Sequence, residues 1–583
     1  MIFFSGLRFD LFSVLVTNAL IILFHLVPAK WFLRKNYQKF LKSLYYVFNI
    51  PALLLNCIDF IYFRFTQKRT TGDLFTSEMA GDIKNNLPTY IAEFWYILLV
   101  VLVMIFAIEF VYRKTGIINT ADKRYGWISS VLMFLSVATL TVIGIRGGLQ
   151  FKPITMQTAA RYAPPQLIPL VLNTPFTVIK TRDMEGLPSE KYMSDKEASS
   201  LISIHHMSGD STLTMQKMNV VIIIMESFSK EYIGFFNHGL GYTPFLDSLC
   251  NHSLVFSNAF ANGKRSIEGI PAVTAGLPPL MDEPFITSAY NTNRINSVAG
   301  SLRTKGYTTA FFHGGNNGTM GLENFSPLAG FEKYFGRDEY NGPEADYDGN
   351  WGIFDEPYFL FFKKQLDQMQ QPFCVTFFSL SSHHPYAIPE HLQNKFPKGK
   401  QAIHESVGYA DYSLQSFFKA AAHSTWYANT LFIITADHTG PAAQPYYRTA
   451  KGIFDVPIIY YAPADTGLKG LSDHVTQHAD IYPSILDYLH FHEPFSAFGS
   501  SVFNSSEHYA ANYTNNLFQF FDNQYMLQFD GENTVGYYAY KKDSFLLNNL
   551  AGQNNSVQYN LERKTKALIQ QYRQAMIHNT LAK

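Results

Sequence analysis

The chain has 583 residues, which is too many for one hydrophobic core, so at least two structural units are expected. The formal net charge is zero, which argues against nucleic acid as the main partner. Three isolated cysteines, Cys57, Cys250 and Cys374, exclude a CxxC metal pattern and a disulfide framework, and only a single bridge between the last two stays open.

Four apolar runs in the first quarter of the chain are each long enough, at roughly 20 residues, to cross a membrane. They lie near residues 11–27, 44–63, 90–111 and 127–145. The first run lacks a basic n-region and a small-residue cleavage site, so a membrane anchor is favoured over a secretory signal. We therefore expect residues 1–146 to form a multi-span anchor in the plasma or inner membrane.

The loops between these runs predict the orientation, because Lys and Arg accumulate on the cytoplasmic side. The loop after the first run contains Lys30, Arg34 and Lys35 with no acidic residue, and the turn after the third run is also basic. Both loops indicate the cytoplasm, which places the large C-terminal domain outside the cell or in the periplasm. Met1 would then lie outside as well, so we expect either that a first helix is missing or that the N-terminus is translocated.

The remainder of the chain has the texture of a soluble α/β protein. Residues 147–216 contain repeated prolines and predict a linker with one or two short helices. From residue 217 to about 505, strand-like runs alternate with helical patterns, which predicts a mostly parallel sheet covered by helices. The strands are expected at residues 220–224, 254–261, 308–312, 373–379, 430–435 and 456–461. Residues 506–583 predict a small antiparallel sheet and a terminal helix at 561–581.

Polar residues follow several of these strands, where parallel sheets place their chemistry. Glu226 ends the β-branched run NVVIIIMES, and Asp437 with His438 follows the strand-like LFII in TADHTG. A lone carboxylate at such a point is more often a cap or a solvated turn residue. Asp and His together, however, supply the oxygen and imidazole ligands that Mn or Zn accept.

Ser266 lies in GKRSIEGIPAVTAGLP, at the start of a helix-like run. It could be an ordinary N-cap, which is the commoner role. It could equally be a nucleophile, because a helix N-terminus stabilises an arriving phosphoryl group and Lys264 or Arg265 would add positive charge. The G-x-S-x-G elbow of acyl hydrolases is absent, and no His or Lys close in sequence offers a base, so metal activation is favoured over a Ser-His-Asp triad.

Histidines follow other strand-like runs. They are His313 in FFHGG, His383 in SLSSHHPY, and His478, which with Asp480 occurs in QHADIYP. Histidines at strand ends are usually structural, yet several in one domain favour a site. Whether His478 and Asp480 build a second metal position stays open.

The anchor, the strand followed by Glu-Ser, GKRS-x-x-G, FHG, a His before Pro-Tyr, and ADH followed by Gly together resemble the lipoteichoic-acid synthase branch of the alkaline phosphatase and sulfatase superfamily. The resemblance implies a five-helix anchor, of which the last four match the runs above, and an alkaline phosphatase/sulfatase-like domain. It implies that a hydroxyl on one divalent ion, usually Mn, moves phosphoglycerol from phosphatidylglycerol to an acceptor.

Carried over by position, the resemblance implies that Glu226, Ser266, Asp437 and His438 bind the metal and that Ser266 is the nucleophile. Candidate substrate-binding residues are His383, His313, Arg265 and His478. Manganese is the expected cofactor, with zinc or magnesium as alternatives. A membrane phospholipid is the expected donor and a glycan or lipid hydroxyl the expected acceptor.

The chain also departs from this branch. The branch usually has Thr as nucleophile in a K-T-S context, and it carries a Trp and an Arg after FHG that hold glycerol phosphate, whereas GNNGTMGLENF follows here. The head group is therefore open between phosphoglycerol and phosphoethanolamine. The formylglycine sulfatase signature is missing as well. We expect a transferase, with a phosphodiesterase or sulfatase of the same fold, or a non-catalytic lipid-binding sensor, as alternatives.

Overall fold

The computed structural model divides the chain into two compact units. The helical unit comprises Met1–Gly186 and Ser288–Asn293, and the sheet unit comprises Leu187–Thr287 and Arg294–Lys583. The structure describes residues 2–26, 34–66, 69–72, 95–114, 126–150, 153–163, 167–182, 186–189, 191–207, 213–504, 508–553 and 555–582.

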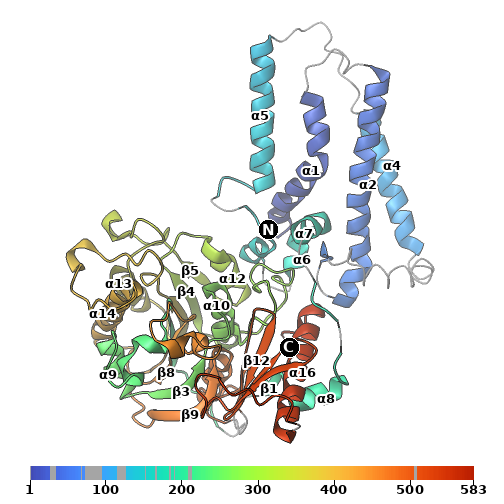
Figure 1. The fold of residues 1–583 in the computed structure, drawn as a ribbon. Helices are drawn as coiled ribbons and strands as arrows, with labels where there is room; N and C mark the ends of the chain where they lie inside the picture. Colours follow the sequence, from blue (N-terminus) through green and yellow to red (C-terminus); the bar gives the residue numbers. More distant parts are fainter. Residues whose placement is uncertain are drawn as a thin grey trace. The chain divides into compact units, whose positions relative to one another are not determined.

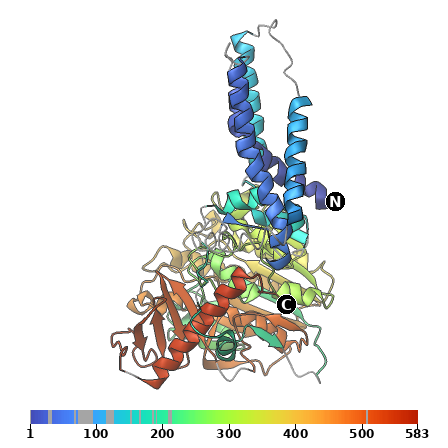
Figure 2. The ribbon, with the colours of Figure 1, turned by 90° about the vertical axis from the view of Figure 1, so that its right-hand side faces the viewer.

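Long apolar helices make up most of the helical unit and run side by side in Figures 1 and 2. They are α1 (Ile2–Leu26), α2 (Lys35–Thr66), α4 (Trp95–Lys114) and α5 (Trp127–Arg146). Within the described residues, these four are long and apolar enough to cross a membrane, which agrees with the four predicted runs. The predicted ends at Val27 and Tyr90 lie outside the described residues.

The segment after α5 contains more helix than the sequence predicted. It carries η3 (Met156–Arg161), α6 (Ile168–Val171), α7 (Thr174–Thr181) and α8 (Asp195–Leu201). Pro169 and Pro175 lie in the first turns of α6 and α7, where a missing N–H is tolerated. The sequence analysis treated these prolines as residues that interrupt helices, whereas in the structure Pro169 and Pro175 lie at helix starts.

An eight-stranded sheet forms the centre of the sheet unit, in the order β5-β4-β6-β2-β7-β8-β3-β9. Its strands are β2 (Asn219–Met225), β3 (Leu254–Phe260), β4 (Thr308–His313), β5 (Lys333–Phe335), β6 (Phe373–Phe378), β7 (Thr430–Ala436), β8 (Ile458–Tyr461) and β9 (Gly470–Gln477). Strand β8 is antiparallel to both neighbours, and the other pairs are parallel. The expectation of a mostly parallel sheet is confirmed.

Helices pack around this sheet (Figure 1). They are α9 (Pro244–Cys250), α10 (Ser266–Ala275), α11 (Val298–Arg303), α12 (Leu322–Leu328), α13 (Asp355–Leu366), α14 (Ile403–Ala421) and α15 (Ile481–Tyr488). A two-stranded sheet pairs β1 (His205–Met207) with β10 (Pro494–Ser496). Cys250 and Cys374 are buried and free, so the disulfide left open by the sequence is absent.

The C-terminal part forms the predicted small antiparallel sheet. It consists of β11 (Ala510–Thr514), β12 (Leu517–Phe521), β13 (Met526–Phe529) and β14 (Thr534–Tyr538), and is followed by α16 (Ser556–Ile577). Phe521 of β12 stacks on Phe260 of β3, with ring centroids 4.6 Å apart. This contact joins the small sheet to the large one beside the segment that leads into α10.

Candidate metal centre and nucleophile

The central strands bring the predicted site residues to one edge of the sheet. Strands β2 and β7 are parallel neighbours in which Met225 pairs with Ala436, so Glu226 and Asp437 follow at matching positions. Both strands are buried along their whole length. The register of two rigid strands therefore fixes the distance between these two carboxylates.

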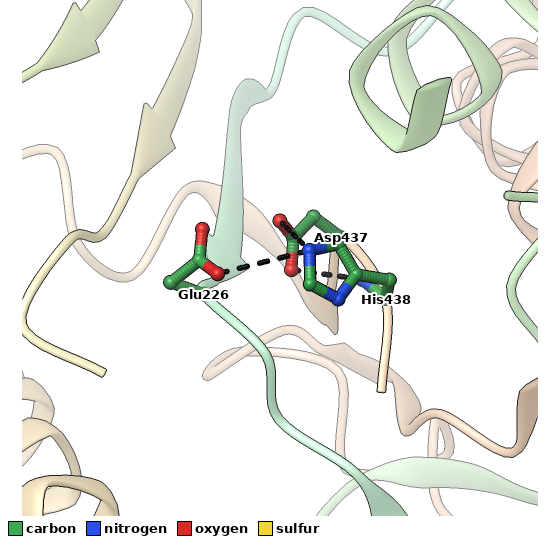
Figure 3. A group of neighbouring side chains, drawn as sticks. All are labelled: Glu226, Asp437 and His438. Carbon is green, nitrogen blue, oxygen red and sulfur yellow. Dashed lines mark hydrogen bonds and ion pairs between the residues drawn. The ribbon is translucent and has the colours of Figure 1, made fainter. Parts of the chain in front are cut away.

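Glu226, Asp437 and His438 converge as shown in Figure 3. Each offers a ligand atom within 4.8 Å of the others, and no second such group occurs among the residues that the structure describes. His438 Nε2 lies 3.3 Å from Asp437 Oδ2 and 3.7 Å from Glu226 Oε1. Ser266 joins them, since its Oγ donates to Glu226 Oε2 at 3.2 Å and lies 3.4 Å from His438 Nε2. The four residues predicted as metal ligands are thus neighbours.

Hydrogen bonds hold both carboxylates in place. Asp437 Oδ1 accepts from the backbone N–H groups of Ser227 and His438, both at 2.8 Å. Glu226 Oε1 accepts from the Ser227 hydroxyl at 2.6 Å. Ser227 has a left-handed backbone, with φ of 58°, which turns the chain directly after β2. Asp437 Oδ2, in contrast, is buried without a hydrogen bond from any described residue.

This arrangement fits a divalent cation. Burial, followed by repulsion from the Asp437 carboxylate, raises the pKa of Glu226 well above its usual value. A cation would offset both effects and would occupy the lone pairs of Asp437 Oδ2. Two carboxylates, one imidazole and one hydroxyl form a hard to borderline ligand set of the kind that Mn, Zn or Mg accept.

The helix that carries Ser266 packs directly on the strand end that carries Asp437. A Cβ atom added to Gly269 would lie 2.3 Å from the Asp437 carbonyl oxygen, so only glycine permits this approach. Ser266 occupies the first turn of α10, where the helix dipole favours negative charge. The spacing S-x-x-G therefore combines a hydroxyl at the helix start with a glycine at the contact.

Lys264 anchors the loop that follows His438. Its Nζ donates to Thr439 Oγ1 at 2.6 Å and to the Ile453 carbonyl at 2.7 Å. Burial lowers the pKa of Lys264 to about 8, an effect that Asp437 opposes. Arg265 instead pairs with Glu268, since its Nε donates to Glu268 Oε1 at 2.7 Å, and its side chain is 56% exposed.

His313 and His478 lie inside the protein. His313 stacks on Phe378 at 4.7 Å, and burial lowers its pKa to about 4. His478, in η12 (His478–Asp480), has no exposed surface, and burial also lowers its pKa to about 4. Asp480 accepts from the backbone N–H groups of Gln477 and Ser500. Substrate contacts by His313, His478 and Arg265 stay predictions. Because the two histidines are buried, we expect them to support neighbouring side chains of the site and not to touch the substrate.

His383 is paired with a residue that the sequence did not single out. The Trp351 ring lies 4.2 Å from the His383 ring, and Trp351 Nε1 donates to the His384 carbonyl at 2.7 Å. Trp351 is 39% exposed. Asp355 supports the same loop, since its Oδ1 accepts from the Leu380 N–H at 2.8 Å. The sequence feature that could have drawn attention to Trp351 is its position as an aromatic residue in the polar run DGNWG.

Comparisons with known proteins agree with this fold. Residues 218–491 match the sulfatase family model. Lipoteichoic acid synthase 2 of Bacillus subtilis (strain 168) is 27% identical over 296 residues, which cover 46% of this chain and 44% of that protein. The lipoteichoic acid synthase-like YvgJ of the same strain is 24% identical over 230 residues, covering 38% and 37%. The chain therefore matches less than half the length of these curated relatives.

Two solved structures share the fold. A protein in the alkaline phosphatase superfamily from Vibrio parahaemolyticus has a TM-score of 0.60 and 22% identity, covering 67% of this chain and 98% of that chain. The lipoteichoic acid synthase LtaP from Listeria monocytogenes has a TM-score of 0.54 and 21% identity, covering 66% and 98%.

Proposed function

We propose that the chain transfers a phospholipid head-group phosphate through Ser266. The proposal is supported by the match of residues 218–491 to the sulfatase family model and by the similarity to lipoteichoic acid synthases. The single observation that carries this proposal is the position of the Ser266 hydroxyl, 3.2 Å from Glu226 Oε2 within the Glu226–Asp437–His438 cluster. The acceptor would be a glycan or lipid hydroxyl. Manganese is the favoured metal.

The metal would be held by Glu226, Asp437, His438 and the Ser266 hydroxyl. When bound, a divalent cation lowers the pKa of a coordinated hydroxyl and polarises phosphoryl oxygens. Glu226 Oε2 accepts the Ser266 hydrogen bond and thereby fixes the direction of the Oγ lone pairs. Asp437 is itself fixed by two backbone N–H groups, which keep the cluster in one geometry before substrate arrives.

The reaction has two steps. In the first, Ser266 Oγ forms a bond to the head-group phosphorus, the bond from phosphorus to the diacylglycerol oxygen breaks, and that oxygen leaves with a proton as diacylglycerol. In the second, an acceptor hydroxyl oxygen loses its proton and bonds to the phosphoseryl phosphorus, the bond from phosphorus to Ser266 Oγ breaks, and Oγ takes up a proton to restore the Ser266 hydroxyl. The N-terminus of α10 stabilises the negative charge on the phosphoryl oxygens in both steps.

The apolar helices of the helical unit support a lipid donor. A protein tethered in the bilayer encounters lipid head groups at a high effective concentration. The sulfatase family match supports a second candidate, a hydrolase in which water is the acceptor of the second step.

Product analysis separates these functions. The purified 583-residue chain with Mn²⁺ is incubated with vesicles that contain head-group-labelled phosphatidylglycerol or phosphatidylethanolamine and a glycolipid acceptor. We expect diacylglycerol release matched by label on the acceptor. Labelled head-group phosphate free in solution, with no modified acceptor, would overturn transfer. An absence of diacylglycerol from both lipids would overturn head-group chemistry altogether. Ser200→Ala, at an exposed position on α8, provides a matched control for Ser266→Ala.

A further inference from the structure

Trp351 is held at the edge of the sheet that carries the metal cluster. Its segment pairs with the residues after β4, since Gly315 and Gly352 form an antiparallel bridge and the Asn316 N–H donates to the Trp351 carbonyl at 3.3 Å. A Cβ atom added to Gly352 would lie 2.1 Å from the Gly314 carbonyl oxygen, which excludes a side chain at this crossing. The motifs FHGG and NWG therefore meet at the carboxyl end of β4.

The side chain of Trp351 forms an aromatic wall with His383. Their ring centroids lie 4.2 Å apart, and Trp351 Nε1 donates to the His384 carbonyl at 2.7 Å. His383 Nδ1 lies 2.9 Å from the same carbonyl oxygen. Because a carbonyl oxygen only accepts, Nδ1 is the donor, and Nε2 of the neutral ring is left as an acceptor. Trp351 is exposed, so part of its ring is open to a ligand.

The segment that carries Trp351 is strongly acidic. Residues 337–352 contain one Arg and five Asp or Glu residues, which gives a formal net charge of −4. The guanidinium of Arg337 is already engaged, because its Nη2 pairs with Glu344 at 2.8 Å. Asp348 lies beside Trp351, since Asp348 Oδ1 accepts from the Trp351 N–H at 2.8 Å. A cation is therefore attracted to this wall, whereas an anion is repelled.

We propose that Trp351 and Asp348 bind a primary ammonium group, so that the phospholipid donor at Ser266 carries a phosphoethanolamine head group. This inference rests on the proposed transfer and names its donor. An ammonium is attracted to the π face of Trp and donates hydrogen bonds to carboxylate and imidazole acceptors. A glycerol head group can donate hydrogen bonds as well, but it has no positive charge for the ring and the acidic segment to attract.

The order of the strands sets the distance that this head group spans. Only β6 lies between β4 and β2, and the Glu226 N–H donates to Ser379 Oγ, just after β6, at 2.8 Å. Neighbouring strands lie about 4.8 Å apart, so the ends of β4 and β2 are about 10 Å apart. Ethanolamine extends about 5 Å from phosphorus to nitrogen, over four bonds of about 1.5 Å. A cation acts on a ring within about 6 Å of its centroid, so ethanolamine on Ser266 is long enough to reach Trp351.

Competition between lipids of similar shape tests the ammonium site. The 583-residue chain with Mn²⁺ is given phosphatidylethanolamine, phosphatidylpropanol and phosphatidylglycerol at equal mole fractions in micelles of an uncharged detergent. Each lipid has different acyl chains, so mass spectrometry assigns the released diacylglycerol to its donor. Phosphatidylpropanol replaces the ammonium by a methyl group. We expect kcat/KM for phosphatidylethanolamine to exceed that of either other lipid about tenfold. Equal values for phosphatidylethanolamine and phosphatidylpropanol, or a preference for phosphatidylglycerol, would overturn the inference.

Matched variants locate the ammonium. Trp351→Leu removes the π face and keeps an apolar side chain, so it should lower the preference for phosphatidylethanolamine over phosphatidylpropanol to about twofold. Asp348→Asn keeps an oxygen for the Trp351 N–H and removes the charge, so it should also narrow the preference. Tyr559→Leu, at a position on α16 that is 66% exposed, should leave the preference unchanged. An unchanged preference in both Trp351→Leu and Asp348→Asn would show that these residues do not bind the ammonium.

A binding measurement separates this inference from the proposed transfer. The Ser266→Ala protein with Mn²⁺ is titrated by calorimetry with O-phosphoethanolamine and with propyl phosphate. Binding of O-phosphoethanolamine that is about tenfold tighter supports the ammonium site even if no lipid releases diacylglycerol, a result that overturns the transfer alone. Equal binding of the two compounds overturns the ammonium site, whether or not the wild-type protein releases diacylglycerol.

Discussion

Replacing Ser266 by Ala removes one oxygen atom and tests the assigned nucleophile. The variant loses the hydrogen bond from Ser266 Oγ to Glu226 Oε2, which contributes roughly 1 kcal/mol to the free energy of unfolding. Glu226 keeps its bond from the Ser227 hydroxyl, and Asp437 keeps both backbone donors. We therefore expect Ser266→Ala to unfold within a few degrees of the wild-type protein.

Turnover should respond far more strongly. Loss of a nucleophile that forms the covalent intermediate removes most of the catalysis, and we expect diacylglycerol release to fall at least about 10⁴-fold, equivalent to about 5.4 kcal/mol in the activation barrier. The assay follows diacylglycerol release from labelled vesicles at saturating Mn²⁺, so that weaker metal binding does not limit the rate. Metal content is measured on the same samples.

Ser227 offers the matched control, since its hydroxyl also donates to Glu226, at 2.6 Å. Ser227→Ala should reduce turnover only about fivefold, because one positioning hydrogen bond is worth about 1 kcal/mol. Ser266→Thr keeps a hydroxyl and should retain measurable turnover. If Ser266→Ala retains activity within tenfold of wild type while Ser227→Ala loses it, the nucleophile is misassigned.

Three further predictions concern the metal, the aromatic pair and a buried acid. Removal of divalent ions with EDTA should abolish turnover. Mn²⁺ at 100 times its Kd should raise the free energy of unfolding by about 2.7 kcal/mol. If Mn²⁺ raises the Tm of Asp437→Asn as much as that of the wild-type protein, this set of metal ligands is wrong. Trp351→Ala should raise KM about tenfold with little change in kcat, and Trp351→Phe should restore most of the affinity, because the ring packs on His383; a loss confined to kcat would exclude a binding role. Burial raises the pKa of Asp355 to about 7, so the folded state retains a proton that the unfolded state releases near pH 4. The resulting stability is present below pH 4 and is lost as pH rises through 7, at about 1.4 kcal/mol per pH unit. Asp355→Asn should therefore show a smaller fall in Tm between pH 5 and pH 7 than wild type, and an equal fall would refute the assignment.

Much of the site could be predicted because it depends on strand ends. The run Val220–Ile224 is uniformly β-branched, so the strand and the position of Glu226 after it follow from local sequence. Asp437 follows a second buried strand, the apolar run TLFIITA, and parallel pairing brings both carboxylates to one edge. The mostly parallel sheet and the four apolar helices could also be predicted, because their strands and helices are segments with clear hydrophobic patterns.

The features that could not be predicted depend on tertiary contacts or on very short elements. Helix α13 and strand β6 separate Trp351 from His383 along the chain, and nothing local indicates that the two rings pair. Strand β5 has only three residues, and β9 is polar along half its length, so neither has a clear strand pattern. The left-handed backbone conformation of Ser227 could not be predicted either, because a serine at that position does not indicate a positive φ.

The strength of the central sheet explains how the protein can hold two buried carboxylates together. Each fully buried Val or Ile of β2 contributes about 1.5 to 3 kcal/mol, so the five from Val220 to Ile224 contribute roughly 8 to 15 kcal/mol to folding. Burial and repulsion from the Asp437 carboxylate both oppose the charged form of Glu226 and raise its pKa. We therefore expect the sheet to form without the cation. Unlike a small zinc domain, whose fold depends on its ion, this unit should remain folded when the metal is removed and should only melt at a lower temperature.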